Sequence, residues 1–526
     1  MNGFLLWFNS HTKMKRWIFL MLIGILLICY GISKIIVTDV IPSAFDIVKI
    51  ALSFALGVTF AIVSIVHLQK RTMELLIENS DTRDETNNVN RLIFNKKVYN
   101  QGPKIVVIGG GSGLNTVLRG LKNYTDNITA IVTVSDYGET PTDSRKALKI
   151  LPMDDISESL AALSYDEKEM TKLLNYKFEQ SKLKDLKFSD IYFLAMNNIK
   201  KNFTKSIECS QSIFNITGKV LPVTLDAINI CAELEDGSIV QSRDEIPEIV
   251  SKTGKRIGRI FISPTNTKAA PGVLEAIKEA DAIVIGPGSL YTNVIPNLLV
   301  RGIAKQIKDS NAIKIYVSNI MTEQGQTDDY TLSDHIKAIQ EYIGKDIIDY
   351  CIYDTGEIVP EFIHKYNLKG ADVVLPDTQN CKALGVKLIQ RNLSVIDGDS
   401  IRHDSDVIAS TIIQLVCDEL EFKDMENDSQ YMMLNSKLIE TKRERKRREK
   451  REKKFLKSGR KQFERKSPDI KSKFMSKYDD RMKSIKDSDT MSKDNKRLKV
   501  EKATEKELLE HVSKIGIGKE DKKKKK

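Results

Sequence analysis

The sequence predicts an α/β fold: a parallel sheet covered by helices on both faces. Two apolar runs, "KIVVI" and "ADAIVI", each end in glycines and lead into a segment with helical spacing. Two more apolar runs, "ITAIVTV" and "AIKIYV", end in polar residues. Strands that alternate with helical segments are typical of a parallel sheet, because each crossover between parallel strands needs a long connection.

The chain of 526 residues is long enough for several domains. We predict four segments. They are a transmembrane hairpin over residues 1–72, a linker over 73–101, a ligand-binding α/β domain over 102–425 and a basic charged tail over 426–526. The six cysteines are widely spaced and show no zinc-binding pattern, so we expect reduced thiols.

Two charge-free apolar runs at the N-terminus predict the hairpin. They are "WIFLMLIGILLICYGIS" (17–33) and "IALSFALGVTFAIVSIV" (50–66), and each with its flanks approaches the roughly 20 residues that cross a bilayer. A cleaved signal peptide would explain only the first run, and buried core helices are the other alternative. Lys and Arg precede the first run and follow the second, so the positive-inside rule places both termini and the main domain in the cytoplasm.

The tail carries the basicity of the chain. Residues 437–526 hold 35 Lys and Arg against 17 Asp and Glu, which leaves 47 against 54 for residues 1–436. The body is therefore mildly acidic, which argues against a nucleic-acid interface there. We expect the tail to be disordered or a solvated helix that is attracted to anionic lipid, with RNA or no specific partner as alternatives.

The segment "KIVVIGGGSGLNTVLRG" (104–120) reads as a buried strand, a glycine turn and a helix. Glycines allow a ligand to approach the backbone, and a helix N-terminus attracts an anion. The spacing is neither that of a dinucleotide fingerprint nor that of a P-loop. We interpret Gly109–Gly113 as a phosphate-binding turn, with a plain tight turn as the alternative.

Two further strand ends carry candidate ligand-binding groups. Asp136 ends the strand "ITAIVTV" about twenty residues after the glycines, where dinucleotide folds place a ribose-binding acid; a loop cap is its alternative role. "IGPGSLYTNVIPNLL" (285–299) repeats the strand, glycine turn and helix. Two anion-binding turns at one sheet edge suit a diphosphate. The predicted ligand-binding residues are Gly109, Gly110, Gly111, Ser112, Gly113, Asn115, Asp136, Gly286, Gly288, Ser289, Tyr291 and Asn319.

These motifs resemble the YvcK family of gluconeogenesis factors, relatives of CofD, the phospholactate transferase of deazaflavin coenzyme synthesis. The resemblance runs from about residue 103 to 416. It rests on "GGGSGLNTVLRGLK", "ITAIVTVSD", "IGPGSLYTNVIPNLLVRGI", "YVSNIMTEQGQTDDYTLSDHI" and "RHD" (402–404). It implies a Rossmann-like domain that binds a nucleotide sugar, notably UDP-N-acetylglucosamine, and no further cofactor. It also implies a regulator that links carbon supply to cell-wall precursor synthesis and cell shape. Some clostridial relatives carry a similar membrane hairpin.

Three segments depart from the family pattern. "SDYGETPTDSRKAL" (135–148) has Tyr137 where the family has a second acid, and it lacks the glycine and serine run. "LPMDDISES" (151–159) has Ser157 where the family has Arg, and "DLKFSD" (185–190) lacks the family's glycines and histidine. Loss of the Arg removes a bidentate phosphate contact, so these changes disfavour transferase chemistry.

Three functions remain open from the sequence. The first is a membrane-tethered, non-enzymatic sensor of a nucleotide sugar, whose partner is a protein of cell-wall precursor metabolism. The second is a CofD-like transferase of a phosphorylated group. The third is a scaffold that has lost its ligand. The sequence assigns no catalytic or metal-binding residue and leaves a homo-oligomer open. His335 is predicted at a helix surface or core edge rather than at a metal, and the role of His403 stays open.

Overall fold

The computed structural model describes residues 15–37, 44–78, 102–134, 153–179, 183, 186–419 and 438–439. The chain forms two compact units, residues 1–97 and 98–526. Several predictions lie outside the described residues. These are the ligand-binding role of Asp136, the segment 135–152, most of the linker and nearly all of the basic tail.

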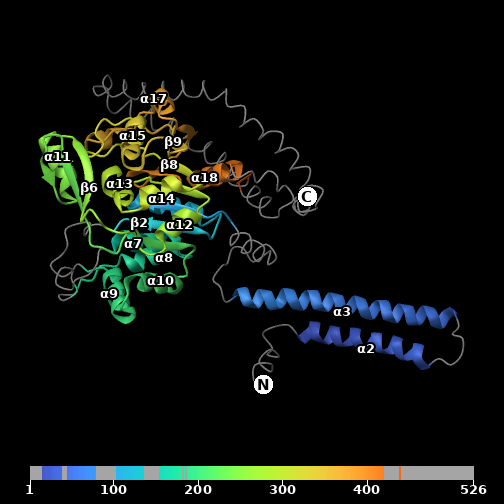
Figure 1. Cartoon of the computed structure of the whole chain (residues 1–526). Helices are drawn as coiled ribbons and strands as arrows, with labels where there is room; N and C mark the ends of the chain where they lie inside the picture. Colours follow the sequence, from blue (N-terminus) through green and yellow to red (C-terminus); the bar gives the residue numbers. More distant parts are fainter. Residues whose placement is uncertain are drawn as a thin grey trace. The chain divides into compact units, whose positions relative to one another are not determined.

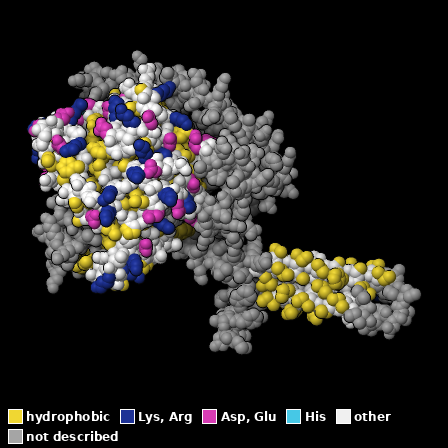
Figure 2. All heavy atoms as spheres, in the orientation of Figure 1, with side chains coloured by type: hydrophobic (Ala, Val, Ile, Leu, Met, Phe, Trp, Pro, Cys, Tyr) yellow, Lys and Arg dark blue, Asp and Glu magenta, His cyan; other side chains and the backbone are white. Residues whose placement is uncertain are grey.

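The first unit contains two long helices, α2 (Lys15–Val37) and α3 (Ala44–Glu78), which run side by side (Figure 1). A Cβ atom on Gly57 would lie 2.8 Å from the carbonyl oxygen of Gly24, so glycines bring the two helix backbones together. Apolar side chains cover the outside of this unit (Figure 2). Segments Arg16–Lys34 and Ile47–Leu68 are each long and apolar enough to cross a membrane. Helix α3 continues six residues past position 72, where the hairpin was predicted to end.

The second unit is built on a seven-stranded sheet with the order β10-β9-β8-β7-β1-β2-β3. Every neighbouring pair in it is parallel, which confirms the predicted α/β class. Its strands are β1 (Ile105–Gly109), β2 (Ile128–Val132), β3 (Lys219–Pro222), β7 (Ala282–Ile285), β8 (Ile313–Val317), β9 (Tyr350–Asp354) and β10 (Lys387–Arg391).

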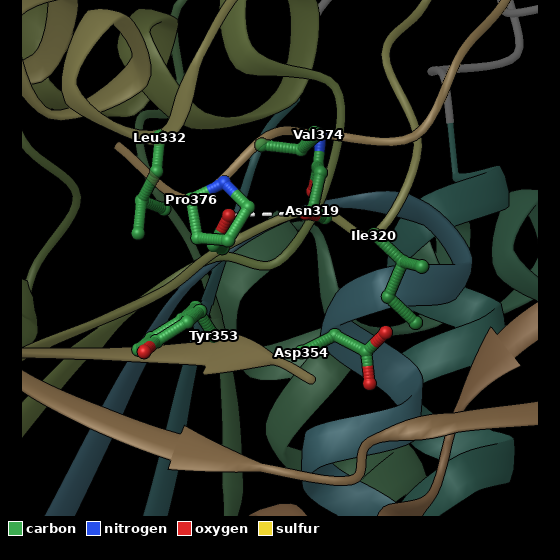
Figure 3. Close-up of a pocket in the computed structure, with 8 residues that line it drawn as sticks. Asn319, Ile320, Leu332, Tyr353, Asp354, Val374 and Pro376 are labelled. Carbon is green, nitrogen blue, oxygen red and sulfur yellow. Dashed lines mark hydrogen bonds between the residues drawn. The ribbon is translucent and has the colours of Figure 1, made fainter. Parts of the chain in front are cut away.

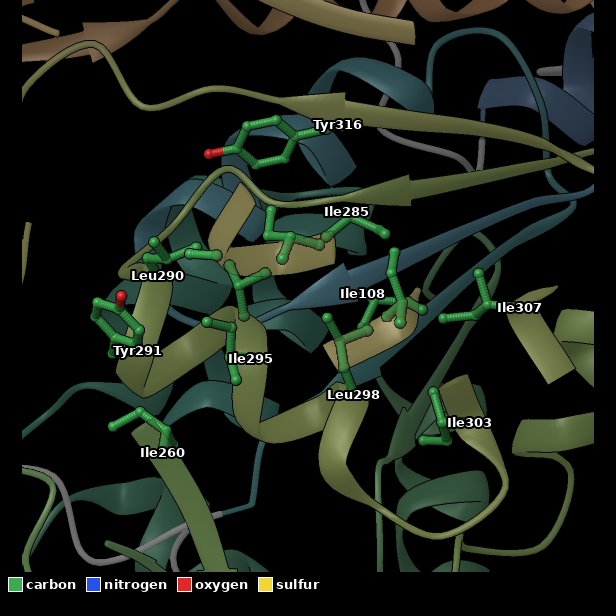
Figure 4. Packing of buried hydrophobic residues seen from close by; sticks show 14 of the residues in the cluster. Ile108, Ile260, Ile285, Leu290, Tyr291, Ile295, Leu298, Ile303, Ile307 and Tyr316 are labelled. Carbon is green, nitrogen blue, oxygen red and sulfur yellow. The ribbon is translucent and has the colours of Figure 1, made fainter. Parts of the chain in front are cut away.

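Alternate residues of each strand pack on opposite faces of the sheet, which is why the strands read as continuous apolar runs. Ile105 and Val107 of β1 belong to one buried cluster, together with residues of α5 (Gly111–Leu121), α7 (Asp154–Leu163) and α18 (Ser405–Glu419). Val106 and Ile108 belong to the other cluster (Figure 4). Burial of each large aliphatic side chain contributes about 1.5–3 kcal/mol, so the two clusters fix the sheet between its helix layers.

The helices of the Ile108 face include α12 (Val273–Glu279), α13 (Ile295–Leu299), α14 (Ile303–Asp309) and α15 (Leu332–Ile343). Three of them, α12 to α14, are labelled in front of the sheet in Figure 1. The remaining helices are α8 (Glu167–Leu174), α9 (Phe188–Lys200), α10 (Phe203–Ile213), α11 (Glu245–Thr253), α16 (Pro360–Asn367) and α17 (Thr378–Ala383).

Two small antiparallel sheets were not predicted. One has the order β5-β4-β6, with β4 (Asn229–Leu234), β5 (Ile239–Val240) and β6 (Ile257–Ser263). It lies in the chain between β3 and β7. The other pairs β11 (Ser394–Asp397) with β12 (Ser400–His403).

The order in which the chain adds strands to the sheet reverses between β1 and β7. From β1 the chain adds β2 and β3 on one side, and from β7 it adds β8, β9 and β10 on the other. Ile108 pairs with Ile285, so β1 and β7 end at the same level. Open α/β sheets bind ligands outside the carboxyl ends of their strands at such a switch point. The topology therefore singles out the ends of β1 and β7, where both glycine segments begin.

Candidate functional site

The first glycine segment follows β1 directly, as predicted, but its turn is shorter than Gly109–Gly113. Gly109 ends the strand, Gly110 is extended (φ −165°) and α5 already begins at Gly111. Gly111 has φ +64°, a left-handed conformation that favours glycine. Ser112 and Gly113 therefore lie in the first turn of the helix. The first N–H groups of a helix have no partner within it and can bind an anion.

The second glycine segment follows β7. Gly286 has φ +72° and Gly288 has φ +156°, so both need glycine. Asn319, just beyond β8, holds this turn: its Oδ1 accepts from the N–H of Gly288 at 3.0 Å, and its Nδ2 donates to the carbonyl oxygen of Gly288 at 3.0 Å. Ser289 Oγ donates to Glu323 Oε1 at 2.9 Å. Asn319 was predicted to bind the ligand, and the structure shows it holding the turn.

The two glycine segments touch each other. A Cβ atom on Gly113 would lie 2.3 Å from the carbonyl oxygen of Pro287, and one on Gly288 would lie 3.3 Å from that of Gly110. Glycine at these positions allows the two backbones to approach more closely than any side chain would permit. The predicted pair of anion-binding turns is thus one continuous backbone surface at the switch point.

Asn293 is a residue at this surface that the sequence did not single out. The segment after Ser289 was predicted as a helix, and it begins as a single π-helical turn, Leu290–Val294, before α13. Such turns are frequent at functional sites. Asn293 Oδ1 would lie 3.2 Å from a Cβ atom on Gly110, and Asn293 Nδ2 would lie 3.1 Å from one on Gly111. The side-chain amide therefore lies directly beside the first glycine turn.

Two predicted ligand-binding side chains are engaged inside the domain. Asn115 is buried; its Nδ2 donates to Glu158 Oε2 at 3.1 Å, and its Oδ1 accepts from Ser159 Oγ at 3.0 Å. The Tyr291 hydroxyl lies 2.7 Å from that of Tyr330. Its ring belongs to the buried cluster in Figure 4, and burial raises the pKa of the phenol. Both side chains therefore stabilise the site through contacts with other residues inside the domain.

A partly buried carboxylate faces the N-terminus of α5. Asp155, at the start of α7, accepts a hydrogen bond from the Gly111 N–H, and its Oδ2 lies 3.6 Å from Arg243 Nη1. Burial raises the pKa of Asp155, although Arg243 and the Gly111 N–H both act to lower it. Burial also raises the pKa of Glu158, followed in importance by the charge of Asp155. Arg243 Nη2 donates to Asn293 Oδ1. The chain's own carboxylate thus occupies one anion position at this helix.

The "RHD" motif also reaches this edge. Arg402 Nη1, on β12, donates to Ser112 Oγ at 2.8 Å in the first turn of α5. His403 Nε2 lies 2.9 Å from the carbonyl oxygen of Ser318, and burial lowers the pKa of His403. The motif therefore joins the carboxyl ends of the strands to the glycine segment, although it lies almost 300 positions later in the sequence.

His335 is a fully buried residue of α15, deeper than the surface or core-edge position predicted for it. Its Nδ1 lies 2.8 Å from the carbonyl oxygen of Thr331, and burial lowers the pKa of the imidazole. Among the described residues, no group of three or more His, Cys, Asp or Glu is placed to bind a metal ion.

A small pocket lies at the carboxyl ends of β8 and β9 (Figure 3). Asp354 borders it, and its Oδ1 accepts hydrogen bonds from the backbone N–H groups of Gly356, Leu393 and Ser394. That carboxylate therefore fixes the loops around the pocket. The lining residues are Ser318, Asn319, Ile320, Leu332, Tyr353, Asp354, Val374 and Pro376. Asn319 connects this pocket to the second glycine turn, so the two features form one candidate site.

Residues 105–394 match the family described as 2-phospho-L-lactate transferase CofD. A relative from Clostridium acetobutylicum, named "Putative gluconeogenesis factor", is 37% identical over 445 residues, which are 84% of this chain and 98% of the relative. The gluconeogenesis factor of Bacillus subtilis is 38% identical over 317 residues, 60% of this chain and 99% of its own length.

A solved structure from Bacillus halodurans, described as a member of the UPF0052 family, shares the fold. It is 40% identical, covers 59% of this chain and 98% of its own, and superimposes with a TM-score of 0.56. The CofD match spans more than half of the sequence and contains both glycine segments. The chain belongs to the CofD family, and its relatives there are gluconeogenesis factors.

Proposed function

We propose that this protein is a membrane-tethered regulator that binds a nucleotide sugar resembling UDP-N-acetylglucosamine at the β1–β7 switch point. The observation that carries the proposal is the contact between the two glycine segments. Together with the N-terminus of α5 they offer backbone N–H groups and a positive dipole end to a diphosphate. The small pocket beside Asn319 lies along the same edge of the sheet.

Such a regulator acts by binding a protein of cell-wall precursor metabolism. Through that protein, the supply of the ligand influences cell shape. The names of the relatives as gluconeogenesis factors support a role in carbon metabolism. The two apolar N-terminal helices support attachment to the cytoplasmic membrane with both termini inside the cell. The basic tail is proposed to add attraction to anionic lipid on that side.

Calorimetric titration of the full chain in detergent micelles with UDP-N-acetylglucosamine tests the proposal. We expect saturable binding in the micromolar to millimolar range that is lost in Gly288→Val, because a side chain at φ +156° distorts the second turn. Arg259→Gln is the control, because Arg259 lies on the small sheet, pairs with Glu233 and is mostly exposed. Absence of heat at millimolar ligand would refute nucleotide-sugar binding and favour a scaffold without ligand.

A CofD-like transferase is the second candidate, and the family match is the observation that favours it. Incubation of the full chain with candidate phosphorylated donors and Mg²⁺, followed by chromatography of released nucleotide, separates the two functions. Turnover that is abolished by Gly288→Val would establish transfer. Binding without release of nucleotide would leave the regulator.

A further inference from the structure

Arg243 belongs to the small three-stranded sheet region but reaches the switch point of the large sheet. It lies between β5 and α11, far in sequence from both glycine segments. Its side chain is only 17% exposed. It contacts Asp155, from the side of the sheet that holds β2 and β3, and Asn293, from the side that holds β7. Arg243 therefore places a positive charge between the two halves of the site.

The pairing of Arg243 with Asp155 is loose. Nη1 and Oδ2 are 3.6 Å apart, whereas a charge-assisted hydrogen bond between such groups measures about 2.7–2.9 Å. Arg243 also donates to a neutral amide, Asn293, and its charge acts on the carboxyl group of Glu323. A guanidinium has five N–H donors in a planar fork that matches a phosphate as well as a carboxylate. A phosphate near Asn293 would thus find a cation that is only partly satisfied by its present neighbours.

The surroundings make this cation necessary for a highly charged ligand. Asp154, Asp155, Glu158 and Glu323 lie around the site, and Lys187 already pairs with Asp154 at 2.7 Å. Four carboxyl groups stand against three cations, Lys187, Arg243 and the Arg402 that contacts Ser112, so a second phosphate still meets like-charge repulsion. Through Asn293, Arg243 is the cation connected to Gly110 and Gly111, where the helix N-terminus attracts the first phosphate.

We propose that Arg243 selects nucleoside diphosphates over monophosphates by exchanging its contact with Asp155 for the second phosphate of the ligand. This inference rests on the proposed nucleotide-sugar function and names the residue that recognises its diphosphate. The first phosphate is held by the backbone of the glycine segments, so it does not depend on Arg243. The second phosphate gains a charge-assisted contact, which corresponds to a preference of about 10- to 100-fold.

The test compares UDP with UMP by calorimetry on the full chain in detergent micelles at constant ionic strength. In the unaltered chain we expect UDP to bind about 10- to 100-fold more tightly than UMP. In Arg243→Gln this ratio should fall to a few-fold at most, while the affinity for UMP stays within about threefold. Arg243→Lys keeps the charge without the planar fork and should give an intermediate ratio.

Arg259→Gln is the matched control, because Arg259 lies on the same small sheet, pairs with Glu233 and is mostly exposed. It should leave the ratio unchanged. Removal of Arg243 alone leaves Asp155 partly buried without its cation, so the double variant Arg243→Gln/Asp155→Asn is measured as well, with thermal unfolding as the check on folding. The double variant should keep the fold and still show a low ratio.

The outcomes separate the two proposals. An unchanged UDP-to-UMP ratio in Arg243→Gln and in the double variant would overturn the role of Arg243 and leave nucleotide binding intact. Absence of binding of both nucleotides and of UDP-N-acetylglucosamine to the unaltered chain would overturn the proposed function, and the role of Arg243 with it. An equal loss of UMP and UDP affinity in a folded Arg243→Gln protein would also overturn selection by Arg243, because it would show a contact with the first phosphate.

Discussion

The contact between the two glycine segments predicts a large effect of the small change Gly113→Ala. The new Cβ atom would lie 2.3 Å from the carbonyl oxygen of Pro287 and 2.7 Å from its carbonyl carbon, whereas ordinary contacts of this kind begin at 3.4 Å. The two segments must therefore separate by about 1 Å. Helix α5 cannot simply retreat, because a Cβ atom on Gly120 would already lie 2.1 Å from the carbonyl oxygen of Ser405, on α18.

The magnitude follows from three contributions. Overpacking of a tight contact costs about 1–3 kcal/mol. Displacement of the second turn strains the two hydrogen bonds between Asn319 and Gly288, each worth about 0.5–1.5 kcal/mol. Alanine in place of glycine returns up to about 1 kcal/mol through its higher helix propensity. We therefore expect a net destabilisation of about 2–3 kcal/mol, which lowers the melting temperature of a domain of this size by about 3–5 °C.

Differential scanning fluorimetry of the full chain in micelles measures the shift, and Gly109→Ala is the control. Gly109 lies in the same motif, its φ is not in the left-handed region, and its Cβ atom would make only ordinary contacts of 3.7 Å or more, with Leu114. Nucleotide affinity should fall more than tenfold in Gly113→Ala and little in Gly109→Ala. If both variants melt within 1 °C of each other and bind nucleotide equally, the two glycine segments are not in contact.

Three further predictions concern charge, the second turn and the membrane. Burial raises the pKa of Asp155 above its ordinary value of 3.8, so its contribution to stability is complete below about pH 4 and is lost as the pH rises through the raised pKa. Asp155→Asn should therefore flatten the pH dependence of the melting temperature above about pH 4; an unchanged curve would show that Asp155 does not contribute to that dependence. Asn319→Ala should cost about 1–3 kcal/mol in urea unfolding, since Gly288 loses both partners, and equal stability would contradict that role. In intact cells an impermeant maleimide should label Ser43→Cys but not Cys209 until the cells are lysed, and the reverse pattern would invert the proposed topology.

The strands of the large sheet could be predicted from the sequence because burial on both faces leaves an unmistakable apolar run. "KIVVI" contains all but the last residue of β1 and "ADAIVI" contains β7, and the register of the two strands places both glycine segments at one level. The small sheet was missed although β4 and β6 are longer than the strands of the large sheet, because only three of the seven residues of β6 are buried. Apolar periodicity is weak in such strands.

The positions of the individual site residues depend on tertiary contacts, and a local sequence pattern does not reveal such contacts. The start of α5 at Gly111 contradicts the poor helix propensity of glycine, and packing against Pro287 outweighs that propensity. Tyr291 lies in a motif rich in candidate ligands, yet its hydroxyl pairs with Tyr330 inside the domain. Arg243 carried no signal at all, because its partners are distant in sequence and the residues around it form an ordinary polar loop.

The position of β1 beside β7 also determines when the site can form while the chain is being synthesised. Strand β1 can pair with β7 only after every residue between them has left the ribosome, including Arg243. The second glycine turn and Asn319 follow later still, whereas the two apolar helices emerge first. Under the proposed function, a growing chain therefore meets the membrane long before it can recognise a nucleotide. Ligand supply then acts only on finished molecules, and premature termination anywhere before β8 yields a product that has the two apolar helices but cannot respond to the ligand.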